Sequence, residues 1–171
     1  MYFSRQAVRI GARRASRRTL TMTNTPNTPL AIERTLHTAH GNATTGREGR
    51  VTADGGALDL ALSVPKGLGG SGGAGTNPEQ LFAAGYAACF SSAITHVARQ
   101  KKLSVGSVEV DTAVSIGPIA GGAFGLAVTI VAHLPELSAA EADALVAEAH
   151  AVCPYSNATR GNIEVTLRVA D

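Results

Sequence analysis

One stretch of this sequence, QLFAAGYAACFSSAITHVA at residues 80–98, looks helical yet is apolar on nearly every side. A helix on the surface of a globular protein keeps a polar face, so this one needs cover on two sides. A membrane span would be one solution, but small residues dominate the stretch and Ser91, Ser92 and His96 interrupt it. We therefore predict no membrane span. The helix should pack against a sheet on one side and a second copy of the chain on the other, as a homodimer.

The sequence around this helix is typical of an α+β domain. Asn77, Pro78 and Gln80 form a helix start, and Ser138 with Glu141 starts a second helix through residue 152. Alternating apolar residues predict strands at 31–40, 57–64, 107–116, 123–134 and 163–169, with a turn-rich connection at 46–56 and a hairpin loop at 117–122. The expected order is βββαββαβ, with two main helices against a largely antiparallel sheet. The inward positions of the hairpin should be Val108, Val110, Val114, Ile116, Phe124, Leu126, Val128 and Ile130.

Charge is distributed unevenly along the chain. Residues 1–30 hold six arginines and no acid, whereas residues 31–171 hold nine Lys and Arg against thirteen Asp and Glu. A nucleic-acid-binding body would carry its basic residues on a folded face, so nucleic acid is not an expected partner. An acid-free leader rich in Arg and Ser is typical of a mitochondrial presequence, with a basic disordered arm as the alternative. We predict a disordered leader at 1–30, one domain at 31–171, a mitochondrial matrix location, and a cytoplasmic form from a second start at Met22.

The two cysteines lie in different surroundings. Cys89 is inside the apolar helix, where burial raises the pKa of a thiol, so it needs a nearby cation to ionise. Cys153 precedes Pro154, and a residue before proline leaves the helical conformation, so we expect it at the edge of a mobile loop. The spacing lacks a CxxC or CxxH pattern, and no metal is expected. Two inert buried thiols are the simpler alternative, but the asymmetry fits an attacking and a resolving cysteine.

Four motifs together resemble a known family. They are GREGR at 46–50, KGLGGSGGAG at 66–75, TNPEQLFAAGYAACF at 76–90 and VCPYSNATRGNI at 152–163. From about residue 32 to 169 the sequence resembles the organic hydroperoxide resistance (Ohr) proteins of the OsmC/Ohr superfamily. The resemblance implies an intertwined homodimer with two shared active sites and a thiol-dependent peroxidase that binds no cofactor. The arginine-rich leader is a departure from this family, which is best known from bacteria.

The resemblance also implies a role for each site residue. Cys89 would be the peroxidatic cysteine, Cys153 the resolving one, Arg47 the activating guanidinium and Glu79 its partner, with Arg50 as the rival to Arg47. The Cys89 thiolate would reduce an organic hydroperoxide to an alcohol and become a sulfenic acid, and Cys153 would then close an intramolecular disulfide. The resemblance further implies that a dihydrolipoyl group on another protein reduces this disulfide, in defence against oxidative stress.

Helix geometry restricts how Glu79 can act. On a continuous helix the ten residues from Glu79 to Cys89 rise about 15 Å, which a glutamate side chain cannot cover. We therefore expect Glu79 to reach across the dimer to Cys89 of the partner subunit, unless the helix is broken. Its alternative role is to stabilise the start of its own helix.

Apolar residues near Cys89 predict the substrate. Phe82, Tyr86 and Phe90 recur at helical spacing around this cysteine, and Ile119 in the hairpin loop adds an apolar wall. Such a wall favours alkyl and fatty-acid hydroperoxides by about 0.8 kcal/mol for each buried methylene, and offers hydrogen peroxide nothing. The alternative is that these aromatic residues are ordinary core.

Three other functions compete with the peroxidase. GLGGSG at 67–72 matches the GxGxxG pattern of nucleotide-binding loops, although the helix begins late and no parallel βαβ pattern surrounds it. A cysteine hydrolase would pair Cys89 with His150 or His96. A structural stress protein without activity is the remaining possibility.

Overall fold

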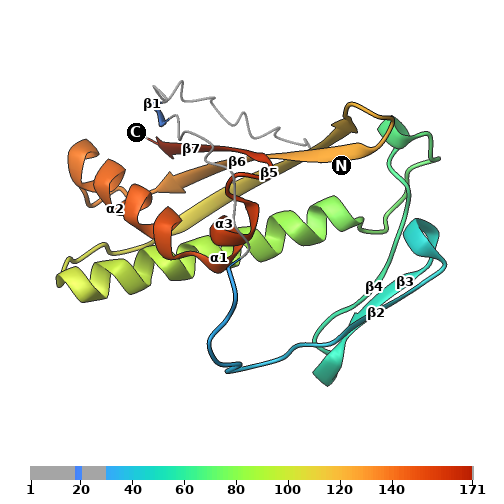
Figure 1. Cartoon of the computed structure of the whole chain (residues 1–171), viewed down its shortest axis with the longest axis horizontal. Helices are drawn as coiled ribbons and strands as arrows, with labels where there is room; N and C mark the ends of the chain where they lie inside the picture. Colours follow the sequence, from blue (N-terminus) through green and yellow to red (C-terminus); the bar gives the residue numbers. More distant parts are fainter. Residues whose placement is uncertain (1–17, 21–29, 171) are drawn as a thin grey trace, which may run out of the picture.

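The computed structural model of the chain describes residues 18–20 and 30–170 (Figure 1). The strands are β1 (Arg18–Leu20), β2 (Gly41–Thr44), β3 (Arg50–Ala53), β4 (Asp59–Ala61), β5 (Glu109–Pro118), β6 (Phe124–His133) and β7 (Glu164–Ala170). The α-helices are α1 (Pro78–Lys101), α2 (Ala139–Val152) and α3 (Pro154–Thr159), and the 3-10 turns are η1 (Gly46–Glu48), η2 (Asp54–Gly56) and η3 (Lys66–Leu68).

The larger sheet has its strands in the order β1, β7, β6, β5. β5 and β6 form an antiparallel hairpin in which Val114 lies opposite Val128. β6 and β7 run parallel, because α2 and α3 carry the chain back between them, as a parallel connection requires. α1 and α2 lie on one face of this sheet (Figure 1). The hydrophobic core fills the space between them, where Phe90, Ile94, Ile130, Leu145 and Leu167 have no or almost no exposed surface.

α1 is the central element of this core. Asn77 caps its start by accepting a hydrogen bond from the Gln80 backbone N–H at 2.9 Å, and Pro78 occupies the first helical position. Among the described residues, α1 is the one helix long and apolar enough to cross a membrane by length and composition. Its buried side faces the sheet, but its opposite side exposes small residues, including Ala84, Ala88 and Ser92.

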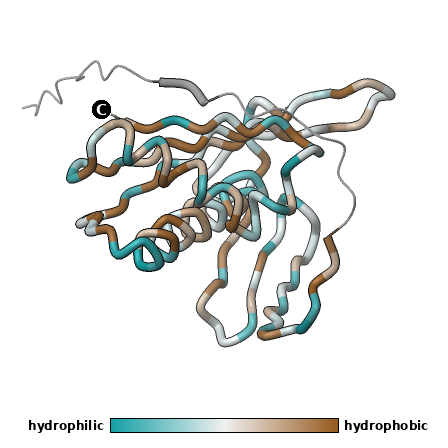
Figure 2. The backbone as a smooth tube through the Cα atoms, turned by 60° about the vertical axis from the view of Figure 1, so that its left-hand side comes forward, coloured by the Kyte–Doolittle hydropathy of each residue, from teal (hydrophilic) through white to brown (hydrophobic). Residues whose placement is uncertain are grey.

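The smaller sheet, β2, β3 and β4, forms an arm that projects from the body of the molecule (Figures 1 and 2). Both of its strand pairs are antiparallel. All residues of β2 and β4 are exposed, including Leu60. Hydrophobic positions nevertheless occur along the strands of both sheets (Figure 2). A three-stranded sheet needs a packed hydrophobic face for stability. The described part of the chain leaves β2 and β4 without such cover.

The predicted α+β class with two main helices is confirmed. The predicted order βββαββαβ is found from β2 to β7 with α3 added before β7, β1 precedes it, and some strands lie elsewhere. Of the three strands predicted before α1, only two are given residue ranges, 31–40 and 57–64. The stretch 31–40 contains no strand, and the turn-rich connection at 46–56 contains β3. These short strands have little buried surface, so apolar alternation does not mark them. Phe124 is 66 % exposed rather than inward, because it begins β6 beside the hairpin loop.

α3 is the one helix that the sequence analysis misses. Its sequence, PYSNAT, is too short and polar to show a helical period. As a result Cys153 does not lie at the edge of a mobile loop. It is fully buried where α2 ends and α3 begins. The expectations for a leader at 1–30 and a start at Met22 fall outside the described residues, apart from the backbone of β1.

Candidate active site

The two cysteines lie in contact inside the core. Cys89 is on the middle of α1, Cys153 joins α2 to α3, and their Sγ atoms are 3.4 Å apart. Both thiols are free, with Cys89 partly exposed and Cys153 fully buried. A disulfide bond is about 2.05 Å long, so the sulfurs need to approach by only about 1.4 Å to form one. The pair can therefore close with little movement of the backbone.

The surroundings of Cys89 within one chain disfavour its ionised form. Burial raises the pKa of the Cys89 thiol, and its hydrogen bond with Cys153 raises it further. The backbone N–H of Tyr155 acts in the opposite direction, since it donates a hydrogen bond to the Cys89 sulfur. The raising effects prevail. A thiolate nucleophile at this position needs a positive charge from elsewhere.

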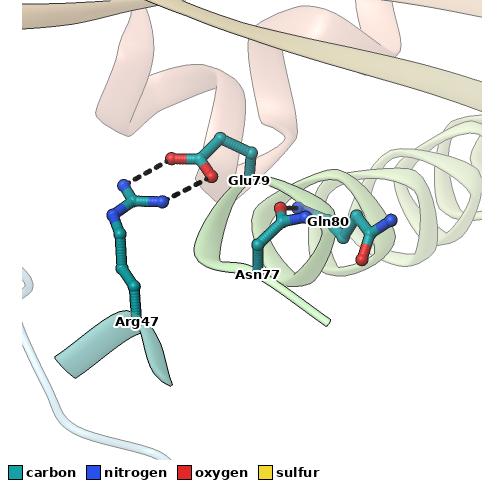
Figure 3. A network of polar contacts seen from close by, with 4 residues as sticks. All are labelled: Arg47, Asn77, Glu79 and Gln80. Atoms are coloured by element: carbon teal, nitrogen blue, oxygen red, sulfur yellow. Dashed lines mark hydrogen bonds and ion pairs between the residues drawn. The ribbon is translucent and has the colours of Figure 1, made fainter. Parts of the chain in front are cut away.

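Arg47 and Glu79 form an ion pair at the start of α1 (Figure 3). Arg47 reaches from η1 and donates Nη1 to Oε2 at 2.8 Å and Nη2 to Oε1 at 2.7 Å. This bidentate hydrogen bonding holds the pKa of Glu79 below its usual value and raises the pKa of Arg47, so both stay charged. Glu79 is largely buried and Arg47 about one-third exposed, which leaves part of the guanidinium open to another group. Arg50 instead binds Asp59 within the arm.

The ion pair is distant from Cys89 of its own chain. α1 is continuous from Pro78 to Lys101, so the rise of about 15 Å between Glu79 and Cys89 applies. Because Arg47 is bound to Glu79 by two hydrogen bonds, the two side chains form one unit at the start of α1. The predicted thiol pair and the predicted ion pair are therefore two separate groups in a single chain.

The four residues predicted to bind substrate have different environments. Tyr86 and Phe90 have no exposed surface and belong to the core. Phe82 is partly buried and stacks on the Tyr155 ring, with centroids 5.8 Å apart. Ile119 is 55 % exposed in the hairpin loop. Only Phe82 and Ile119 have surface available to a ligand in this conformation.

A cavity of about 460 Å³ lies beside the ion pair. Glu79 contributes to its wall, and most of the other lining residues are apolar. The sequence analysis assigns none of these apolar residues to a pocket, because they come from three segments that only the fold brings together. They include Pro65 and Leu68 from the glycine-rich segment, Ala83 from α1, and Val114 and Ile116 from β5.

Polar residues on α3 also escape the sequence analysis. The Tyr86 hydroxyl lies 3.0 Å from Ser156 Oγ and 3.2 Å from Thr159 Oγ1, all three residues being buried. These bonds attach α3 to α1 beside the thiol pair. Their signal in the sequence is the polar run YSNAT at 155–159, which follows Cys153 and Pro154 where an apolar core segment would be expected to continue.

The chain is similar to a known family of proteins over most of its length. A model of the family described as OsmC-like protein matches residues 70–168. The organic hydroperoxide resistance protein of Xanthomonas axonopodis pv. citri is 58% identical over 139 residues, covering 81% of this chain and 97% of that protein. The chain belongs to the OsmC/Ohr superfamily.

Solved structures of this superfamily share the fold. The organic hydroperoxide resistance protein OsmC from Legionella pneumophila aligns with a TM-score of 0.77 and 51% identity, covering 81% of this chain and 100% of that one. A related Vibrio cholerae protein, with captopril bound in one of its active sites, aligns with a TM-score of 0.76 and 48% identity, covering 81% and 97%. OhrB of Bacillus subtilis aligns with a TM-score of 0.74 and 43% identity, covering 79% and 99%.

The OsmC/Ohr fold gives the glycine run a structural role. A Cβ atom at Gly70 would lie 2.3 Å from the Val64 carbonyl oxygen, and one at Gly75 would lie 2.6 Å from the Leu62 carbonyl carbon. Both glycines therefore allow the loop to fold back on the preceding strand. The sheet also lacks the repeated parallel βαβ units of a dinucleotide-binding fold. The nucleotide-binding alternative is not favoured.

The OsmC/Ohr chain offers little support for a hydrolase or a metal site. His96 bonds to Gln100 on the exposed side of α1. His150 is buried beside Phe90, and burial together with the Arg160 charge lowers its pKa to about 4. In the described part of the chain, neither histidine is hydrogen-bonded to Cys89, whose side-chain partner is Cys153. Within residues 18–20 and 30–170, no cluster of His, Cys, Asp and Glu side chains is suited to a metal ion.

Proposed function

We propose that the chain is a thiol-dependent peroxidase that reduces organic hydroperoxides to alcohols. The observation that carries this proposal is the 3.4 Å contact between two free thiols, one of them fully buried. It occurs in a chain similar to proteins named for organic hydroperoxide resistance. A buried thiol beside a partly exposed one suits a reaction in which the exposed sulfur is oxidised first.

The chemistry balances with these two sulfurs alone. The Cys89 thiolate attacks one peroxide oxygen, the O–O bond breaks, and the alkoxide leaves as an alcohol after taking a proton. Cys89 is then a sulfenic acid. The Cys153 sulfur attacks it, water leaves, and a disulfide forms. Early closure protects Cys89 from oxidation by a second hydroperoxide.

A homodimer would complete this site. The arm needs a packing partner, and α1 exposes a strip of small residues that lets another backbone approach closely. Large hydrophobic side chains are also exposed in the segment before the arm, where Ile32 is 79 % and Leu36 is 83 % exposed. Such surfaces mark protein interfaces. The related V. cholerae structure, with captopril in one of its active sites, implies more than one site in that protein.

In this dimer, Arg47 and Glu79 would serve the partner's Cys89. The pair is too far along α1 to reach the thiol of its own chain, and the thiol requires a cation. A guanidinium at hydrogen-bond distance favours the thiolate and can also polarise the leaving peroxide oxygen. Glu79 keeps the guanidinium in a fixed orientation through two hydrogen bonds.

The apolar cavity beside the ion pair would hold the organic part of the substrate. Because Glu79 lines the cavity, an alkyl chain bound there would place its hydroperoxide group near the guanidinium. Each buried methylene favours binding by about 0.8 kcal/mol. Alkyl and fatty-acid hydroperoxides should therefore react faster than hydrogen peroxide. Phe82 and Ile119 remain candidates for contact with the substrate.

Stopped-flow oxidation of the reduced protein tests the proposal. We expect an alkyl hydroperoxide to oxidise the wild type much faster than hydrogen peroxide does, and Cys89→Ser to abolish the reaction. Cys153→Ser should consume one equivalent to form the Cys89 sulfenic acid and a second to form the sulfinic acid, without forming the intramolecular disulfide. An acyl-enzyme burst with an ester substrate, without peroxide consumption, would favour the hydrolase instead.

The reductant and the compartment are extensions of the same proposal. Dihydrolipoamide should regenerate the oxidised protein faster than glutathione in the same assay. The acid-free, arginine-rich composition of residues 1–30 supports import into the mitochondrial matrix, with a second, cytoplasmic form starting at Met22. Mass spectrometry of the mature N-terminus in each compartment would test both forms.

A further inference from the structure

The junction between α2 and α3 has a missing hydrogen bond. In a helix the carbonyl of His150 would accept from the backbone N–H four residues later, but that residue is Pro154, which has no N–H. The preceding carbonyl, of Ala149, is satisfied by the Cys153 N–H at 2.9 Å. His150 lies in the buried last turn of α2, so its carbonyl needs another donor.

Arg160 supplies this donor from the far end of α3. Its Nη2 donates to the His150 carbonyl oxygen at 2.5 Å, ten residues back along the chain. Its Nη1 donates to Asn157 Oδ1 at 2.7 Å, which orients the guanidinium. The Arg160 side chain therefore joins the end of α2 to α3 and fixes the angle between the two helices. A charge-assisted bond of this kind is among the stronger hydrogen bonds in proteins.

Cys153 is the single residue at this junction. Its backbone N–H belongs to the last turn of α2, and its carbonyl accepts from the Asn157 N–H at 2.9 Å in the first turn of α3. A change in the angle between the helices would move its sulfur directly. The Tyr86 hydroxyl on α1 binds Ser156, which lies within α3. This bond holds α3 against α1 but does not hold Cys153 itself.

We propose that Arg160 is a positioning residue that holds the Cys153 sulfur against Cys89. It touches neither sulfur. By fixing the angle between α2 and α3, it keeps the two sulfurs in contact in the reduced protein. It thereby sets the rate of disulfide closure and not the rate at which hydroperoxide oxidises Cys89.

This inference rests on the proposed function for its consequence in catalysis. The Cys89 sulfenic acid has two fates. Attack by the Cys153 sulfur gives the disulfide and water, whereas a second hydroperoxide gives the sulfinic acid and an alcohol. Loosening the junction slows the first path and leaves the second unchanged, so the sulfinic fraction rises.

Rapid quenching of the reduced protein with excess alkyl hydroperoxide, followed by mass spectrometry, measures the two products. For Arg160→Met we expect closure to slow about tenfold, the scale of one charged hydrogen bond, and Cys89 sulfinic acid to accumulate. The initial oxidation of Cys89 should keep its wild-type rate. Arg160→Lys, which keeps the charge and one donor, should lie in between.

Lys101→Met is the matched control. It removes a cation that links α1 to α2 through Glu148 at 2.6 Å, without touching the junction. Its ratio of disulfide to sulfinic acid should equal that of the wild type. Asn157→Ala removes only one of the two hydrogen bonds of the Arg160 guanidinium, so it should raise the sulfinic fraction less than Arg160→Met does. It replaces Arg160→Met in the test if circular dichroism shows that Arg160→Met does not fold.

Equilibration in glutathione redox buffers separates this inference from the proposed function. It measures the equilibrium between the Cys89–Cys153 disulfide and the two free thiols without any hydroperoxide. Arg160→Met should shift this equilibrium about tenfold toward the free thiols. If the wild type does not react with hydroperoxide but Arg160→Met still shows this shift relative to the wild type, the peroxidase is refuted and the role of Arg160 is supported. The inference is overturned if Arg160→Met folds and forms the disulfide at the wild-type rate and with the wild-type equilibrium. If Arg160→Met is unfolded, wild-type values for Asn157→Ala in both assays overturn it instead.

Discussion

At the scale of single residues, the main feature is a set of polar side chains buried beside the two thiols. The hydroxyls of Tyr86, Ser156 and Thr159 and the imidazole of His150 all lie in an otherwise apolar core. Each such group costs free energy unless it is hydrogen-bonded. Their retention next to Cys89 and Cys153 is consistent with a core that positions two sulfurs as well as stabilising the fold.

Tyr86→Phe should destabilise the protein by about 1–3 kcal/mol, because it leaves the buried Ser156 hydroxyl without its donor. Urea unfolding of the two proteins measures this difference. Tyr155→Phe is the matched control, since it removes a hydroxyl from a ring that is 38 % exposed. An equal, small effect of both substitutions would show that the Tyr86 hydroxyl does not anchor α3.

His150 should make stability depend on pH. Burial and the Arg160 charge lower its pKa from 6.5 to about 4 in the folded state, so the unfolded chain binds a proton first as the pH falls. The stabilisation is complete above pH 6.5 and decreases below it, by about 2 kcal/mol between pH 6.5 and 4.5. His150→Leu should lack this component in unfolding experiments at the two pH values. Identical pH dependence in both proteins would contradict the assignment.

Residue types alone predict much of the site. The helix that carries Cys89 and the helix end at Cys153 can be read from the residues, whereas the choice of Arg47 depends on the resemblance to the Ohr proteins. The burial of Cys153 cannot, because α3 has no apolar period and its anchor is a tyrosine seventy residues away. The same reason makes Tyr86 look like a pocket residue when it is a core residue.

At the scale of elements, capping residues define both main helices and are readable from sequence. Ser138 and Glu141 form the expected reciprocal box at the start of α2. Asn77 caps α1 with a single hydrogen bond from the Gln80 N–H, two residues before Glu79. The strands of the arm are less predictable, since their burial depends on contacts outside the chain. Alternation therefore marks β5, β6 and β7 better than β2, β3 and β4.

Asn77→Ala should cost about 1 kcal/mol of stability, because the first turn of α1 loses its side-chain acceptor. The same substitution should reduce peroxidase activity, since Glu79 and its bound Arg47 depend on that turn. Asn77→Ser keeps a capping oxygen and is the control. Thermal unfolding and peroxide consumption measure the two effects. Wild-type values of both for Asn77→Ala would show that this cap does not order the turn.

At the scale of the whole molecule, the separation of the ion pair from the thiol pair led us to propose a site shared by two chains. Two variants that are each inactive should therefore complement one another. Mixed dimers of Cys89→Ser and Arg47→Ala would contain one complete site, with Cys89 from one chain and Arg47 from the other. We expect about half of the wild-type activity per mixed dimer.

Co-expression with two affinity tags would isolate these mixed dimers for the peroxidase assay. Activity restored by mixing supports a shared site. Mixed dimers as inactive as their parents would mean that Arg47 serves Cys89 of its own chain or neither. The Arg50→Ala homodimer distinguishes the two arginines, because Arg50 is bound to Asp59 and its loss should leave activity close to wild type, whereas the Arg47→Ala homodimer should be inactive.

The central claim concerns two sulfurs of one chain, and a thiol titration tests it most directly. One equivalent of an alkyl hydroperoxide per chain is added to the fully reduced protein, and the remaining thiols are counted before peptide mapping. The account predicts that both thiols disappear together and that a single bond joins Cys89 to Cys153 within the same chain. Two surviving thiols, or a disulfide between chains, would contradict it.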